Sequence, residues 1–157
     1  ITCYVDASHA SDIVTRRSVT GILLCINRTL VKWYSKRQNT VESSTYGSEF
    51  VAARIACELI MEFRYKLRML GFKLTEPAVL IVDNESLVKN TTLPSSSLKK
   101  KHNAIAYHKV RECVAAGIIK VAFLRSQENR ADILTKPLAP QLYYKLLEGI
   151  LFRKNSL

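Results

Sequence analysis

The stretch Ala78-Val79-Leu80-Ile81-Val82-Asp83-Asn84 decides how this chain of 157 residues folds. Its run of apolar residues predicts a short strand buried on both faces, inside a sheet that is at least partly parallel. The strand ends in a carboxylate and an amide, and ligands of open α/β sheets bind at the carboxyl ends of the strands. Asp83 is therefore either a functional acid or only part of the cap of the helix that follows.

The composition predicts a basic globular protein of one domain. With 157 residues, 48% of them hydrophobic, the chain is long enough to bury a core. A formal net charge of +11 favours a polyanionic partner, with nucleic acid ahead of an acidic membrane surface. No apolar run approaches the roughly 20 residues of a membrane-spanning helix, so no membrane insertion is expected. The four cysteines lack C-x-x-C spacing, which predicts buried free thiols in a reducing compartment.

The pattern of apolar residues predicts an α/β domain with the element order βββ-α-β-α-β-α. Short connections between the first three strands predict an antiparallel meander, and helical crossovers predict parallel pairing of the last two. Gly21, inside the second strand, predicts either a bulge or a close contact. The strands are expected at residues 1–6, 18–26, 30–35, 78–82 and 118–124, and the helices at 40–70, 85–90, 103–116 and 141–152, with a further helical turn from 131.

The longest helical pattern, residues 40–70, carries an acid on its apolar side. Glu49 falls in line with Ala53 on the face expected to meet the core, whereas Arg64 is expected among the charged residues of the outer face. A carboxylate in a core-facing stripe is costly to bury unless a cation meets it. Glu49 is therefore either a functional acid or a rim glutamate paired with a nearby Lys or Arg.

Four acids occupy related positions in the predicted fold. Asp6 ends the first strand, Asp83 ends the fourth and Asp132 begins the turn after the fifth, while Glu49 comes from the long helix. If the first and fourth strands are parallel neighbours, Asp6 and Asp83 emerge at one edge of the sheet. Converging carboxylates repel one another unless divalent cations neutralise them, and oxygen ligands suit Mg²⁺ or Mn²⁺. Such a cluster in a basic protein fits phosphodiester chemistry with two metal ions about 4 Å apart.

Seven segments of the chain occur in an informative order: residues 4–8, 16–21, 33–38, 43–50, 83–86, 101–104 and 130–138. The most specific one ends in Ala131-Asp132-Ile133-Leu134-Thr135-Lys136-Pro137. Together they resemble the ribonuclease H domain at the end of copia-type retrotransposon polyproteins. The resemblance implies a ribonuclease H-like α/β fold, with a mixed sheet of three antiparallel and two parallel strands flanked by helices. It also implies a catalytic domain at residues 1–139 and a C-terminal helix and tail at 140–157.

The resemblance further implies an endoribonuclease that cleaves the RNA strand of RNA–DNA hybrids during reverse transcription. Asp6, Glu49, Asp83 and Asp132 would be its catalytic acids and would bind two Mg²⁺ ions, which Mn²⁺ can replace. The expected partners are the hybrid and an adjacent reverse transcriptase domain of the same polyprotein, in cytoplasmic virus-like particles or in the nucleus. Nucleic-acid contacts are expected at Arg16, Arg17, Ser44, Asn84, Lys99, Lys100, Lys101 and His102.

Some of these assignments have alternatives. The lysine run could be a solvated loop, and His102 a loop or helix-cap residue. Copia-type relatives often carry acids where this chain has Ser8 and Tyr46, and residues 125–129 lack the His that cellular ribonucleases H place in that loop. A catalytically silent hybrid- or RNA-binding module serving a polymerase is the alternative function, although such a module has no need of four acids. A transposase or integrase core of the same superfold would show another acid order, ending in Glu.

Overall fold

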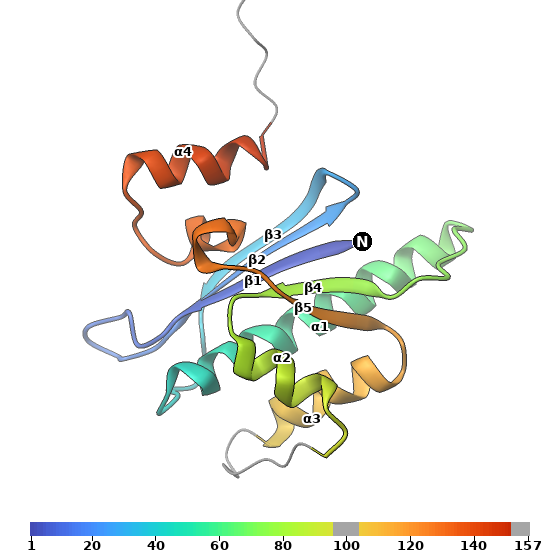
Figure 1. The fold of residues 1–157 in the computed structure, drawn as a ribbon, viewed down its shortest axis with the longest axis horizontal. Helices are drawn as coiled ribbons and strands as arrows, with labels where there is room; N and C mark the ends of the chain where they lie inside the picture. Colours follow the sequence, from blue (N-terminus) through green and yellow to red (C-terminus); the bar gives the residue numbers. More distant parts are fainter. Residues whose placement is uncertain (96–103, 152–157) are drawn as a thin grey trace, which may run out of the picture.

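The computed structural model describes residues 1–95 and 104–151, whose strands form one five-stranded sheet in the order β3-β2-β1-β4-β5 (Figure 1). β2 pairs with β1 and β3 in antiparallel fashion, whereas β4 pairs with β1 and β5 in parallel. The predicted mixed sheet is therefore confirmed. In chain order, the elements are β1 (Thr2–Ser8), β2 (Val19–Ile26), β3 (Thr29–Arg37), α1 (Thr45–Met69), β4 (Ala78–Val82), α2 (Glu85–Thr92), α3 (Ala104–Ala115), β5 (Ile119–Phe123), the 3₁₀ turns η2 (Ser126–Glu128) and η3 (Arg130–Leu134), and α4 (Pro140–Glu148).

Different elements pack against the two faces of the sheet. Helices α1 and α3 lie on one side, and η3 with α4 lies on the other (Figure 1). Because side chains alternate along a strand, Val5 of β1 joins the hydrophobic core beside α1, whereas Asp6 points to the side of η3. This alternation separates the packed core from the polar side chains of the sheet.

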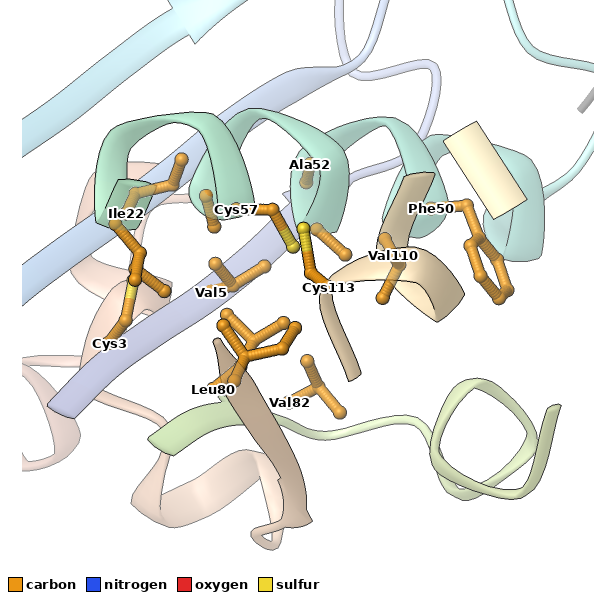
Figure 2. Packing of buried hydrophobic residues seen from close by; sticks show 14 of the residues in the cluster. Cys3, Val5, Ile22, Phe50, Ala52, Cys57, Leu80, Val82, Val110 and Cys113 are labelled. Carbon is orange, nitrogen blue, oxygen red and sulfur yellow. The ribbon is translucent and has the colours of Figure 1, made fainter. Parts of the chain in front are cut away.

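The core fills the space between the sheet and the two helices α1 and α3. Figure 2 shows Val5 and Leu80 from the sheet facing Cys57 of α1 and Cys113 of α3. All four cysteines of the chain are buried free thiols, as predicted. Within the described ranges, no helix is long and apolar enough to span a bilayer.

The ends of α1 follow from local chemistry. The helix begins at Thr45, inside the helical pattern of residues 40–70, because the side chain of Ser44 accepts a hydrogen bond from the backbone N–H of Gly47 at 3.2 Å. After its last turn, Gly71 adopts a φ of +86°, which ends the helix where the apolar pattern stops.

The prediction that Arg64 lies on the outer face of this helix is wrong. Arg64 is only 7% exposed, and its Nη1 donates a hydrogen bond to the carbonyl oxygen of Glu76 at 2.7 Å. The guanidinium therefore ties α1 to the segment that leads into β4. A long side chain can bury its aliphatic stem while its charged end finds a polar partner, and helical periodicity does not show that partner.

Candidate active site

Three aspartates from distant parts of the chain converge at one edge of the sheet. β1 and β4 are parallel neighbours, so Asp6 of β1 and Asp83, which follows β4, emerge on the same side. Asp132 reaches them from η3, and one carboxylate oxygen of each aspartate lies within 4.8 Å of the other two. Asp6 and Asp132 are only 5% and 2% exposed, which makes this a largely desolvated acid cluster.

A glycine of β2 allows η3 to approach the sheet this closely. Gly21 pairs with Asp6 across the β1–β2 ladder. A Cβ at position 21 would lie 2.6 Å from Cγ2 of Thr135 and 2.9 Å from the carbonyl oxygen of Ala131. The close contact predicted at Gly21 is confirmed, whereas the register irregularity of β2 lies farther along, between Leu24 and Cys25.

Two side-chain hydrogen bonds hold η3 on the sheet. The buried Asn129 donates from Nδ2 to the carbonyl oxygen of Val5 at 2.9 Å, and its Oδ1 accepts from the backbone N–H of Ala131. Ser35 of β3 donates from Oγ to the carbonyl oxygen of Leu134 at 2.7 Å. The turn that carries Asp132 is therefore anchored at both of its ends.

Sequence reasoning assigned no role to two residues that contact the acids. The hydroxyl of Thr135 donates a hydrogen bond to Oδ2 of Asp6. The ammonium of Lys136 lies 2.8 Å from Oδ2 of Asp132 and 3.9 Å from Oδ2 of Asp6. Lys136 follows Asp132 by four residues, and this spacing was the signal that could have suggested their ion pair.

Glu49 lies beside the three aspartates without belonging to the tight group. Its Oε2 is buried and has no hydrogen-bond partner among the described residues. Among the described residues it forms no ion pair with Lys or Arg. A side-chain hydrogen bond from Asn84 and the charges of Asp83 and Asp6 act on its carboxyl group.

Burial and the charges of neighbouring acids raise the pKa values of Glu49, Asp132 and Asp6. Burial, reinforced by the charges of Asp83 and Asp6, raises the pKa of Glu49 to about 7. Burial and the nearby charge of Asp6 raise the pKa of Asp132 to about 6, although Lys136 opposes the change. The pKa of Asp6 is also raised by burial, against the hydrogen bond from Thr135 and the charge of Lys136. The site is therefore short of positive charge.

The donor atoms of the site fit a hard divalent cation. All four acids offer oxygen ligands, the type preferred by Mg²⁺ and Mn²⁺. Oδ1 of Asp132, like Oε2 of Glu49, is buried without a hydrogen-bond partner in the described residues. Buried polar atoms are normally satisfied, and divalent cations held by these acids would supply partners for such oxygens.

The predicted nucleic-acid contacts lie in different settings. Arg16 and Arg17 are exposed on the connection between β1 and β2. Ser44 caps α1, whereas Asn84 caps α2 and also forms a side-chain hydrogen bond with Glu49, so each has a structural role. The predicted contacts at residues 99–102 lie outside the described part of the chain.

No protein-family model matches the chain, but individual relatives do. It is 33% identical over 133 residues to the retrovirus-related Pol polyprotein from transposon TNT 1-94 of Nicotiana tabacum, a match that covers 85% of this chain and 10% of the relative. It is 30% identical over 136 residues to the corresponding polyprotein from transposon RE1 of Arabidopsis thaliana, covering 87% of this chain and 9% of the relative. The chain therefore spans about a tenth of the length of these curated relatives.

Solved structures with the same fold include ribonucleases H. RNase H1 from the archaeon Halobacterium salinarum superimposes with a TM-score of 0.64 at 18% identity, over 85% of this chain and 92% of that one. LC11-RNase H1 in complex with an RNA/DNA hybrid gives a TM-score of 0.63 at 16% identity, with the same coverage. At 16–18% identity, the similarity to these structures shows only a shared fold. The family is shown by the two polyproteins, which are 30–33% identical to this chain. This chain is therefore a homologue of one segment of the Pol polyproteins of plant LTR retrotransposons, and that segment has the ribonuclease H fold.

Proposed function

We propose that this chain is an endoribonuclease that cleaves the RNA strand of RNA–DNA hybrids during retrotransposon reverse transcription. The observation that carries the proposal is the convergence of Asp6, Asp83 and Asp132 within 4.8 Å, with Glu49 beside them. Repelling carboxylates at one sheet edge destabilise a fold, so their convergence indicates a cation-dependent function. The net charge of +11 supports a polyanionic substrate.

The four acids would hold two Mg²⁺ ions, which Mn²⁺ could replace. When bound, the ions would supply an activated water and stabilise charge on the leaving oxygen. The chain's own contribution is a rigid, largely dry arrangement of ligands: Thr135 orients the carboxylate of Asp6, and Asn84 orients that of Glu49. Such preorganised groups need little rearrangement during the reaction.

Basic residues outside the acid cluster would position the hybrid by its phosphates. Arg16 and Arg17 are exposed on the connection that follows β1, the strand that carries Asp6. Contacts to phosphates position a nucleic acid without reading its sequence, which suits a nuclease that acts along a growing hybrid. We place the activity beside a reverse transcriptase domain of the same polyprotein, in cytoplasmic virus-like particles.

A cleavage assay on end-labelled RNA paired with DNA tests this function. Wild-type protein should cut the RNA strand in Mg²⁺ or Mn²⁺, bind without turnover in Ca²⁺ and stop in excess chelator, because Ca²⁺ arranges its ligands more loosely. Asp83→Asn should abolish cleavage while the thermal unfolding transition stays intact, since it removes a charge from a repelling cluster. Duplex DNA and single-stranded RNA are the matched substrate controls.

Two results would overturn the proposal. Full cleavage in excess chelator would exclude a metal-dependent mechanism, and wild-type cleavage by Asp83→Asn would remove that aspartate from the site. Tight hybrid binding with no cleavage in either metal would instead support the alternative, a silent binding module that serves the polymerase.

A further inference from the structure

One cation of the chain already contacts the acid cluster. The ammonium of Lys136 lies 2.8 Å from Oδ2 of Asp132 and 3.9 Å from Oδ2 of Asp6, so it bridges two of the three converging aspartates. The first contact has the length of a charge-assisted hydrogen bond. Both aspartates are among the ligands assigned above to divalent cations, so this inference rests on the proposed function.

Lys136 combines an anchored backbone with a mobile charged end. Its backbone N–H donates to the carbonyl oxygen of Asp132 at 3.3 Å, and its neighbour Thr135 donates its hydroxyl to Asp6. The side chain of Lys136 is 38% exposed, whereas those of Asp6 and Asp132 are nearly covered. A lysine carries its charge on a flexible four-carbon stem, so the ammonium can leave the carboxylates while the backbone keeps its place.

The lysine and a divalent cation need the same oxygens. Mg²⁺ takes carboxylate oxygens at about 2.0–2.1 Å, so an ion bound through Oδ2 of Asp132 and an ammonium hydrogen-bonded to that atom would be close enough to repel each other. Without any cation, the three converging aspartates would repel one another instead. Oδ2 of Asp132 therefore favours either the ammonium of Lys136 or a divalent cation, and not both at once.

We propose that Lys136 is an internal counter-ion of the acid cluster, which holds Asp132 and Asp6 together and leaves their oxygens when divalent cations bind. The lysine stabilises the folded chain before metal arrives, and it weakens metal binding because its hydrogen bond must first be broken. The released ammonium then lies at the mouth of the site. Lys136 is a positioning residue in this scheme, since it acts through the two aspartates.

Metal binding without nucleic acid tests the proposal directly. The affinity for Mn²⁺, followed by the loss of the free-ion electron paramagnetic resonance signal, should be about tenfold tighter in Lys136→Met than in wild type, because the competing charge-assisted hydrogen bond is gone. Lys136→Arg should bind Mn²⁺ no more tightly than wild type, since a guanidinium pairs with carboxylates through two hydrogen bonds. Lys66→Met is the matched control, because Lys66 also forms an ion pair with the acid at i−4, Glu62, outside the cluster.

Thermal unfolding supplies a second reading of the same variants. In divalent-free buffer Lys136→Met should melt below wild type, and saturating Mg²⁺ should close the gap. If this variant fails to fold, NMR of the wild-type protein tests the proposal instead. Titration with Ca²⁺ should shift the resonance of Cε of Lys136, the carbon bonded to the ammonium nitrogen, toward its chemical shift in free lysine. An unmoved resonance would overturn the proposal.

The outcomes also separate this proposal from the proposed function. If wild type binds Mn²⁺ and folded Lys136→Met binds it equally or more weakly, the counter-ion role is wrong while the nuclease assignment stands. If neither protein binds Mn²⁺, the metal-dependent function itself is wrong, and the counter-ion role falls with it.

Discussion

Replacing Gly21 by alanine should disturb the site through a single methyl group. The added carbon would lie 2.6 Å from Cγ2 of Thr135, 2.9 Å from the carbonyl oxygen of Ala131 and 3.0 Å from Cβ of Leu134. Carbon atoms in contact are normally about 3.5–4.0 Å apart, so η3 must move outward by roughly 1 Å. β2 cannot yield instead, because it is hydrogen-bonded on both sides by β1 and β3.

The size of the effect follows from that displacement. Overpacking of this kind costs about 1–3 kcal/mol, which for a chain of this length lowers Tm by roughly 2–12 °C. The same shift carries Asp132 and Thr135 away from Asp6, and a misplacement of about 1 Å can cost about 100-fold in rate. We therefore expect a larger effect on cleavage than the loss of stability alone would cause.

The assay compares Gly21→Ala with Gly117→Ala. Gly117 has a φ of +64°, and apart from its chain neighbours no heavy atom of the described residues lies within 4 Å of the place that a Cβ would take. Alanine there therefore costs about 1–2 kcal/mol of backbone strain far from the acids. Both variants should melt earlier than wild type, but only Gly21→Ala should lose cleavage of labelled hybrid per folded molecule at saturating Mg²⁺. Wild-type cleavage by a folded Gly21→Ala protein would refute the claim that this close approach places Asp132.

Two further predictions concern charge. In divalent-free buffer, stability should fall as the pH rises from the ordinary carboxyl range toward 7. The folded chain retains protons on Glu49 and Asp132, whose pKa values are raised to about 7 and about 6, while the unfolded chain releases them. An unchanged Tm from pH 5 to 7 would count against the clustering of these acids. Replacing Lys99, Lys100 and Lys101 by alanine should lower the slope of log affinity for hybrid against log salt by ~2 to 3, with cleavage by bound protein little changed. Parallel salt lines for mutant and wild type would show that the run faces water.

Local sequence patterns predicted the elements and their order. A run of five apolar residues before Asp83 predicted a strand in a parallel part of the sheet, and β4 does pair in parallel with β1 and β5. The expected burial on both faces is only partial, because Val79 and Ile81 are half-buried. Short connections predicted the antiparallel pairs, and parallel pairing then brought Asp6 to the edge occupied by Asp83. The exact first residue of a helix depends on side-chain capping, as the cap at Ser44 shows for α1.

The sequence by itself thus determined the order of the elements and the family resemblance, because each depends on periodicity or on the order of residues along the chain. It predicted the convergence of the aspartates only on the condition that the first and fourth strands are parallel neighbours, which the structure decided. Only the tertiary structure decided the contacts around the acids. Thr135 and Asp6 are 129 residues apart, and their hydrogen bond exists because η3 lies directly on Gly21. The same packing buries the carboxylates, which raises the pKa of Asp132 and brings Lys136 to it. Desolvation depends on every neighbour in space, so it follows from the packed fold and has no signature in a local stretch of sequence.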